Sequence, residues 1–351
     1  MENAVKTTEK QKYVFIEVLR IAACFLVIVN HTNSDIFMYK QPWPNGIWLA
    51  SLTYFFISKM AVPIFVMISG YTMLDKEDSY KKSAMRVLRS VAVLLLFSLI
   101  YYLQQWQNGA RTEIGIKDYF LSVYRTPLSL AYWYMYMYIG LLIMMPFLQK
   151  LVAKLNKREM QIFIFISLFV KGTMPIIEHI WPQFTYSRLF DFAIFDSYIG
   201  MLMIGCYMKK YATRSLKWLV LSIVGFVAAL GFNVVMTFFE FWANGGANYF
   251  FYEERTLFPI ILEGICFFYI VMYFSWSGIA AKVLKVIGGC TFGIFLLSDL
   301  FIDKYRYVYE GLYAGGMHPM LAVVLFELLV FTIGFVITFV LKKLPVFRKL
   351  L

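Results

Sequence analysis

The chain has 351 residues, of which 61% are hydrophobic and only 15% are charged. Ordinary soluble domains carry about 25% charged residues, so this composition excludes a typical soluble fold and supplies enough apolar sequence for many membrane spans. The net charge of +12 fits either a nucleic-acid-binding protein or a membrane protein, because the cytoplasmic loops of membrane proteins carry an excess of basic residues.

The N-terminal segment 1–12 is polar and ends in two lysines, and the apolar run after it has no small-residue cleavage site of the usual kind. We therefore expect a cytoplasmic tail and a retained first span. The four cysteines lie far apart in apolar runs, a pattern that predicts small buried side chains and neither a metal site nor a disulfide framework. They are Cys24, Cys206, Cys266 and Cys290.

A helix needs about 20 mostly apolar residues to cross a bilayer, and the sequence contains about ten such runs. In chain order they are 13–31, 47–74, 87–106, 130–151, 161–171 extended to 177, 193–208, 216–240, 256–276, 283–302 and 318–341. These runs predict an all-α membrane domain over 13–341, a C-terminal tail over 342–351 and no appended soluble domain.

The basic residues predict the orientation of this domain. When alternate loops are assigned to alternate sides, about two thirds of the 33 Lys and Arg residues fall on the side of the N-terminus. By the positive-inside rule, both termini are then cytoplasmic and the number of spans is even. The positive charge is thus a topology signal, and no nucleic-acid partner is expected.

The first span carries the most informative polar residues. A helix turns by about 100° per residue, so Glu17, Arg20, Cys24 and His31 share one face, and Arg20 lies about 16 Å from His31 along the axis. This separation is comparable to an extended pantetheine arm. Intramembrane charges are costly and often functional. The alternative is a simple Glu17–Arg20 ion pair with a histidine at the end of the helix.

The second and third spans add further polar positions. Lys59 lies deep in the second span and needs a carboxylate or a cavity, whereas Pro63 permits a kink and Ser69-Gly70 allows close helix approach. The third span opens with Arg86-Val-Leu-Arg89 beside Lys81 and Lys82. Clustered arginines suit phosphate groups, although a basic helix entrance also follows from the positive-inside bias alone.

Three of these motifs, in this order, resemble the integral-membrane acyltransferase 3 family. They are the acid and Arg-X10-His of the first span, the run Val62-Pro-Ile-Phe-Val-Met-Ile-Ser69-Gly70-Tyr71, and the Arg-x-x-Arg of the third span. The similarity continues at Trp133-Tyr-Met-Tyr-Met-Tyr-Ile-Gly140, at 200–207 and at 289–297, so it covers nearly the whole chain.

The resemblance implies about ten spans and the transfer of an acyl group, often acetyl, from cytoplasmic acyl-CoA to a hydroxyl of a cell-envelope saccharide or lipid-linked glycan in the bacterial plasma membrane. It implies that His31 is the essential histidine, with Arg20 and Glu17 as its partners. Acyl-CoA is a substrate, and no bound cofactor or metal is expected. The residues expected to bind acyl-CoA are Arg86, Arg89, Lys82, Ser69 and Tyr71.

The chain also departs from the family pattern. Relatives often have a histidine just before the tryptophan of the fourth span, where this chain has Ala131 and Tyr132. Another histidine often follows the late aromatic-Leu motif, where this chain has Ser298 and Asp299. Neither position can therefore assist His31 here.

The expected mechanism uses His31 as general base on the acceptor hydroxyl, with Arg20 or Lys59 as the positive charge near the developing oxyanion. Carboxylates and aromatic rings suit sugar hydroxyls and sugar faces. The acceptor-side candidates are Lys59, Trp133, Glu178, Arg188, Glu263 and Asp299.

Two other function classes stay open from the sequence. Polar residues at mid-membrane also mark substrate paths, which favours an exporter of an envelope glycan precursor, although the sequence shows no paired Gly- or Pro-broken segments in two halves. A membrane domain that keeps the fold without catalysis is the second alternative, because of the departures at Ala131 and Ser298.

Overall fold

The computed structural model describes residues 14–32, 46–187, 192–243 and 250–351. These residues form helices and no strand, so the predicted all-α fold class is confirmed. The chain divides into two compact units, one made of residues 1–76 and 151–289 and the other of residues 77–150 and 290–351.

The first unit contains the N-terminal helices and most of the second half of the chain. Its long elements are α2 (Val14–Thr32), α3 (Gly46–Lys59), α4 (Ala61–Met73), α8 (Lys157–Ser167), α9 (Met174–Ile180), α10 (Ser197–Tyr211), α11 (Leu216–Ala243), α13 (Phe258–Tyr273) and α14 (Gly278–Gly288). A π-helical turn, Leu168–Thr173, joins α8 to α9, and short 3-10 turns lie at Pro182–Phe184 and Ala193–Phe195. The four-residue α12 (Phe250–Glu253) lies between α11 and α13.

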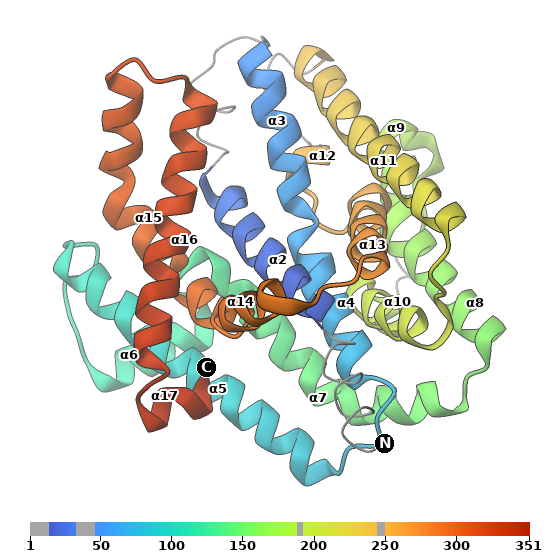
Figure 1. Ribbon diagram of the computed structural model, residues 1–351, viewed down its shortest axis with the longest axis horizontal. Coiled ribbons are helices and arrows are strands. Elements are labelled where there is room, and N and C mark those ends of the chain that lie inside the picture. Colours follow the sequence, from blue (N-terminus) through green and yellow to red (C-terminus); the bar gives the residue numbers. More distant parts are fainter. Residues whose placement is uncertain (1–13, 33–45, 188–191, 244–249) are drawn as a thin grey trace. The chain divides into compact units, whose positions relative to one another are not determined.

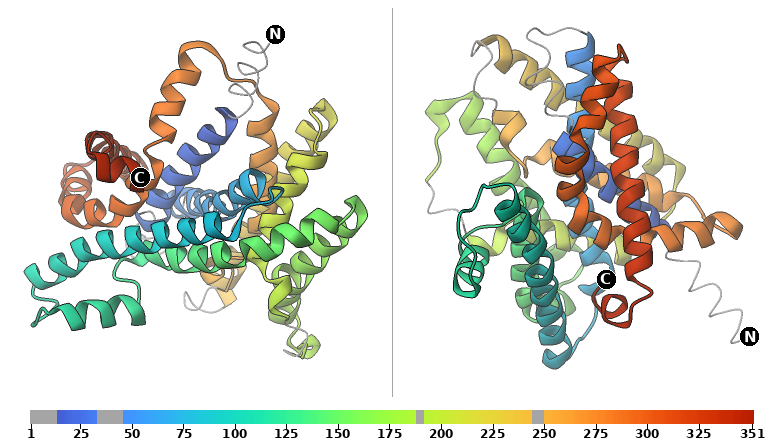
Figure 2. Two further views of the ribbon diagram at one scale, coloured as in Figure 1. Left: turned by 90° about the horizontal axis from the view of Figure 1, so that it is seen from below. Right: turned by 90° about the vertical axis from the view of Figure 1, so that its left-hand side faces the viewer.

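The second unit contains α5 (Tyr80–Gln107), α6 (Ile116–Arg125), a 3-10 turn at Leu130–Tyr132, all but the last turn of α7 (Trp133–Lys154), α15 (Thr291–Ala314), α16 (Pro319–Leu341) and α17 (Pro345–Leu350). Figure 1 shows α15 and α16 packed side by side as an antiparallel pair. Both views of Figure 2 show α6 folded back along the end of α5.

Local sequence explains where several helices begin. Ser79 caps α5 by accepting a 3.3 Å hydrogen bond from the backbone N–H of Lys82. Asn156 and Glu159 form a reciprocal capping box at the start of α8. Asp196 accepts a 2.8 Å hydrogen bond from the N–H of Tyr198 at the start of α10. Each cap satisfies a backbone N–H that has no partner inside the helix.

The helices match the expectation of a multi-pass membrane protein. Within the described ranges, seven helical segments are long and apolar enough to cross a membrane, and α14 with α15 makes an eighth if the pair is one broken span. The predicted spans 193–208 and 256–276 correspond to the shorter helices α10 and α13. Each of the predicted runs therefore contains a helix. The number of runs that cross the membrane and the side of the membrane on which the termini lie stay predictions.

In two predicted spans, residues outside any helix separate two α-helices. The run 47–74 is interrupted at Met60, between α3 and α4, three residues before Pro63. The run 283–302 is interrupted between Gly288 and Thr291. A proline fits the first turn of a helix better than its interior, and paired glycines weaken a helix, so both breaks have a local cause.

The close approach predicted at Ser69-Gly70 is confirmed in the first unit, where α4 packs against α10. A Cβ atom on Gly70 would lie 2.0 Å from the carbonyl oxygen of Leu202, and one on Gly205 would lie 2.0 Å from that of Met67. The two helices thus approach each other backbone to backbone through a reciprocal pair of glycines. The four cysteines are buried, as predicted.

Candidate active site

Glu17 and Arg20 form an ion pair on α2. Arg20 Nη1 donates a 2.9 Å hydrogen bond to Glu17 Oε1, at the i, i+3 spacing of a helix. The other side of Glu17 lies against the end of α14, because a Cβ atom on Gly288 would be 2.3 Å from Glu17 Oε2. The pair considered from the sequence therefore exists, and it holds Arg20 near the glycine end of α14.

His31 is the penultimate residue of α2 and is half-buried. Its neighbour Asn30 donates a 3.1 Å hydrogen bond from Nδ2 to the hydroxyl of Ser58 on α3. Ser58 in turn donates to the carbonyl of Phe55 at 2.5 Å. These bonds tie the helix end that carries His31 to the helix end that carries Lys59.

The side chain of Lys59 is bound by backbone carbonyls. Its ammonium donates to the carbonyls of Phe251 at 3.3 Å and Glu254 at 2.6 Å, and also to that of Tyr252. The rings of Phe55, Phe56 and Tyr252 lie 5.4 to 5.6 Å from the same nitrogen. The sequence predicts that Lys59 needs a carboxylate or a cavity. Its partner is instead the C-terminal end of the short helix α12, and aromatic rings surround the ammonium group.

Glu263 on α13 is fully buried and paired with α11. Asn233 Nδ2 donates a 2.6 Å hydrogen bond to Glu263 Oε1. Two further acceptor atoms, Glu263 Oε2 and Asn233 Oδ1, have no hydrogen-bond partner among the described residues. Of the other acceptor-side candidates, Glu178 is half-buried in α9, and Arg188 lies outside the described residues.

A second histidine of the first unit, His179, has a buried carboxylate partner that the sequence did not predict. His179 Nε2 of α9 lies 2.6 Å from Oε1 of Glu240 on α11, and Glu240 is buried. The other carboxylate oxygen, Oε2, accepts a 3.2 Å hydrogen bond from the N–H of Phe251. The sequence feature that could have indicated this contact is the carboxylate of Glu240 inside an apolar run, because such a group needs a partner.

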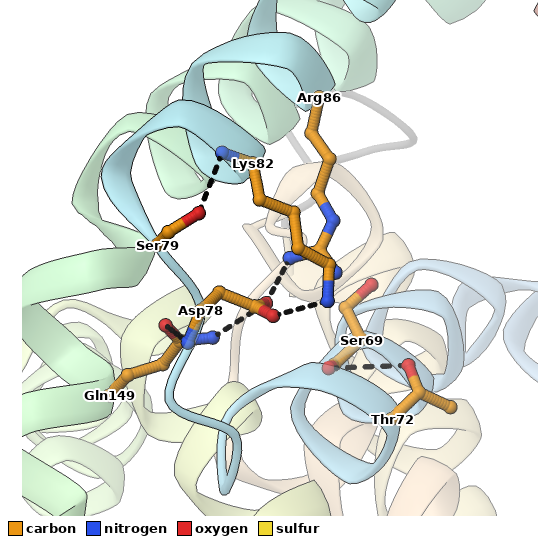
Figure 3. A network of polar contacts seen from close by, with 7 residues as sticks. All are labelled: Ser69, Thr72, Asp78, Ser79, Lys82, Arg86 and Gln149. Atoms are coloured by element: carbon orange, nitrogen blue, oxygen red, sulfur yellow. Dashed lines mark hydrogen bonds and ion pairs between the residues drawn. The ribbon is translucent and has the colours of Figure 1, made fainter.

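The predicted donor-side residues of the second unit gather around Asp78 (Figure 3). Lys82 Nζ lies 2.6 Å from Asp78 Oδ1, Arg86 Nη1 pairs with Oδ2, and Gln149 Nε2 donates to Oδ2 at 3.2 Å. The Asp78 side chain is only 3% exposed. The bond to Asp78 uses one of the five N–H donors of the Arg86 guanidinium.

Asp78 lies in the loop before α5 and its acidity reflects its partners. Burial by itself would raise the pKa of this carboxyl, but the hydrogen bonds from Lys82, Arg86 and Gln149 outweigh burial and lower the pKa from 3.8 to about 2. Asp78 is therefore a charged anchor for the basic residues at the start of α5.

Arg89, the second arginine of the motif, is bound to the C-terminal helix of the same unit. Its Nε and Nη2 atoms donate to the carbonyl of Leu350 on α17 at 3.2 and 3.1 Å. The ring of Phe347 packs edge-on against Phe97 of α5 at 6.5 Å. Both arginines of the motif therefore belong to this unit, each with a different partner.

Ser69 and Tyr71, the other predicted acyl-CoA contacts, are buried in α4 of the first unit. Ser69 donates to the carbonyl of Phe65 at 3.1 Å, and its own carbonyl accepts from Thr72 at 3.5 Å (Figure 3). The ring of Tyr71 packs on Phe15 at 5.4 Å. Both residues take part in helix packing.

Asp299 connects the two places where this chain departs from the family pattern. Its Oδ2 accepts hydrogen bonds from the hydroxyl of Ser129 at 2.6 Å and from the N–H of Ala131 at 2.9 Å. Ser298 donates to the carbonyl of Phe295 at 2.9 Å. In the second unit a buried aspartate thus binds the chain just before Trp133, the half-buried first residue of α7.

Comparison with known proteins agrees with this arrangement of motifs. The model of the acyltransferase 3 family, described as "Acyltransferase domain", matches residues 13–342. Proteins of Staphylococcus aureus strains MRSA252, MSSA476 and MW2 are each 20% identical to this chain, over 94% of its length and 93% of theirs. Each is named "Probable poly-beta-1,6-N-acetyl-D-glucosamine export protein". No solved structure matches. Because the family model covers nearly the whole chain, this multi-pass membrane protein belongs to the acyltransferase 3 family.

Proposed function

We propose that the chain is a membrane O-acyltransferase that moves an acyl group, acetyl in the first instance, from cytoplasmic acyl-CoA to a hydroxyl of a cell-envelope saccharide. The observation that carries the proposal is the position of His31. It is half-buried at the end of α2, on the helix whose other half holds the Glu17–Arg20 pair. Family membership over residues 13–342 supports acyl transfer as the chemistry.

In the proposed reaction, His31 takes the proton of the acceptor hydroxyl, and the oxygen attacks the thioester carbonyl. A neutral imidazole performs this role near physiological pH. The tetrahedral intermediate then collapses, the carbon–sulfur bond breaks, and the proton passes to the CoA thiolate. The products are the acylated saccharide and free CoA, so atoms and charge balance without a metal or redox partner.

The donor phosphates are proposed to bind Arg86, Arg89 and Lys82. Guanidinium groups bind phosphate oxygens bidentately, which makes arginine a better phosphate ligand than its charge alone suggests. Asp78 supports this assignment because it holds Lys82 and Arg86 together at the start of α5. It leaves the remaining N–H groups of Arg86 for a ligand.

The acceptor is proposed to be an N-acetylglucosamine saccharide, the saccharide class that the names of the relatives contain. On the acceptor side, the first unit offers Glu178 and Glu263, and one carboxylate oxygen of Glu263 has no hydrogen-bond partner among the described residues. Buried carboxylates accept hydrogen bonds from sugar hydroxyls well, and an unpaired one gains most from such a ligand.

The test uses purified protein in liposomes, acetyl-CoA labelled in the acetyl group, and a short β-1,6-linked N-acetylglucosamine oligosaccharide as the probe acceptor. We expect label in the oligosaccharide and one free CoA for each transferred acetyl group, with loss of both in His31→Ala. Unchanged turnover in His31→Ala would refute the general-base role. CoA release without labelled saccharide would refute O-acylation of this acceptor class.

Export of the saccharide is the second candidate, and two observations favour it. The relatives are named as export proteins, at 20% identity. In addition, the spans 47–74 and 283–302 are broken at Met60 and after Gly288. Discontinuous helices often border transport sites. Movement of the labelled oligosaccharide across the liposome membrane without acetyl-CoA would support export over acyl transfer.

A further inference from the structure

The short helix α12 inserts Phe251 into the core of the first unit, whereas Glu253 at its end is exposed. Phe251 is fully buried and belongs to a cluster with Trp48, Leu52, Phe56, Ile176, Leu257 and Ile260. Four residues are too few to form a stable helix alone, because nucleation fixes more backbone freedom than one or two hydrogen bonds repay. The helix therefore depends on the groups that bind its ends.

Lys59 binds the C-terminal end of α12. A lysine ammonium has three N–H donors, and the structure gives three acceptors, the carbonyls of Phe251, Tyr252 and Glu254. The ring of Phe55 stacks on Tyr252 at 4.5 Å and covers the same charge. With its three donors engaged, Lys59 in this arrangement holds the chain in position and has none left for a reaction oxyanion.

Glu240 binds the N-terminal end of α12, through the 3.2 Å bond from Phe251 N–H to its Oε2. Its Oε1 lies 2.6 Å from His179, whose ring stacks on Phe250 at 4.1 Å. An acid at the N-terminal end and a base at the C-terminal end match the partial charges of the helix. The two charged groups therefore clamp α12 from both sides.

The clamp is connected to His31. Lys59 directly follows Ser58, whose hydroxyl accepts the hydrogen bond from Asn30, the residue before His31. A shift of α12 is thus transmitted through Lys59 and the Asn30–Ser58 hydrogen bond to the end of α2 that carries His31. On the proposed function, the neighbourhood of His31 is where the acceptor hydroxyl binds.

We propose that Lys59 and Glu240 clamp α12 as the wall of the acceptor site beside His31, and that Lys59 is a positioning residue for acyl transfer. The acceptor-wall part rests on the proposed function, whereas the clamp itself does not. Release of α12 should weaken binding of the saccharide and leave binding of acetyl-CoA unchanged.

The experiment compares Lys59→Met, Lys59→Arg and His179→Phe with the wild type and with Lys217→Met, a control at the exposed start of α11. Amide exchange of residues 250–254 measures the clamp. In Lys59→Met we expect exchange at least about tenfold faster and a KM for the β-1,6-linked oligosaccharide at least about tenfold higher, with the KM for acetyl-CoA within about twofold. Lys59→Arg keeps donors for the carbonyls and should restore part of both changes.

Unchanged exchange in Lys59→Met and His179→Phe would overturn the clamp. An equal rise in both KM values, or a loss in kcat alone, would overturn the acceptor-wall role. If Lys59→Met does not fold, His179→Phe decides, because it keeps an aromatic ring on Phe250 and removes only the contact with Glu240. If the wild type transfers no acetyl group, the proposed function and the wall role fail together, and exchange still decides the clamp.

Discussion

The side-chain amide of Asn30 donates a 3.1 Å hydrogen bond to the hydroxyl of Ser58, which joins the helix end that carries His31 to the helix end that carries Lys59. His31 and Lys59, which the sequence places in different spans, therefore each directly follow a residue of this hydrogen bond in the first unit. Variants near His31 should therefore distinguish residues that take part in the reaction from residues that only position other groups.

Replacement of His31 by alanine should abolish acyl transfer without unfolding the protein. Loss of a general base lowers turnover by a factor on the order of 10²–10⁴. The measurement is the transfer of labelled acetyl to the β-1,6-linked oligosaccharide in liposomes. His318→Ala is a matched control, because His318 is exposed at the start of α16. A similar loss in the control would point to a general effect of histidine removal.

Arg89→Gln should weaken donor binding in a way that depends on the nucleotide phosphates. A lost charge-assisted hydrogen bond costs about 1.5–3 kcal/mol, or roughly a tenfold to hundredfold rise in the KM for acetyl-CoA. Arg89 is the cleaner choice of the two arginines, because its partner is the carbonyl of Leu350, whereas Arg86→Gln would leave the buried Asp78 with one cation fewer.

S-acetylpantetheine, which lacks the nucleotide phosphates, gives the control for Arg89→Gln. The variant and the wild type should use this short donor with the same KM. A penalty of equal size for both donors would contradict phosphate binding at Arg89. Arg111→Gln serves as the control variant, because Arg111 pairs with Asp118 near the other end of α5.

The helices were predictable from the sequence because a span leaves a long apolar run, and each predicted run contains a helix. The breaks were harder to predict. Pro63 indicated a kink, and the interruption at Met60 places this proline in the first turn of α4, but a proline alone does not determine at which residue the preceding helix ends. The ends of α3 and α4 therefore had to come from the structure.

The polar partners were predictable only where they lie close in sequence. Glu17–Arg20 is an i, i+3 pair within α2, a spacing that the geometry of a helix predicts. Asp78 lies in the loop before α5, so its contacts with Lys82 and Arg86 do not follow from helix geometry. Lys59 binds carbonyls more than 190 residues away, and backbone atoms have no sequence signature. His179 and Glu240 lie in different runs, so their contact depends on tertiary packing.

The second unit should lose stability in acid, because protonation of Asp78 removes its stabilising contribution. A carboxyl whose pKa falls from 3.8 to about 2 on folding stabilises the folded state above the unfolded pKa, and this contribution is lost as the pH falls from about 4 to about 2. The shift corresponds to about 2 kcal/mol. Asp78→Asn should lose this amount at neutral pH and flatten the dependence of unfolding on pH between 4 and 2, as measured by thermal unfolding in detergent. An unchanged slope would contradict the role of Asp78.

Gly205→Ala should destabilise the first unit more than an alanine at another helical glycine. The added Cβ would lie 2.0 Å from the carbonyl oxygen of Met67, so the backbones of α4 and α10 would have to separate. Overpacking against backbone atoms costs about 3 kcal/mol or more, because no side-chain rotation relieves it. Gly231→Ala in α11 is the matched control, since a Cβ there meets nothing within 4 Å and alanine favours a helix. Unfolding temperatures in detergent measure both variants, and equal values would show that α4 and α10 tolerate a wider separation than their glycines indicate.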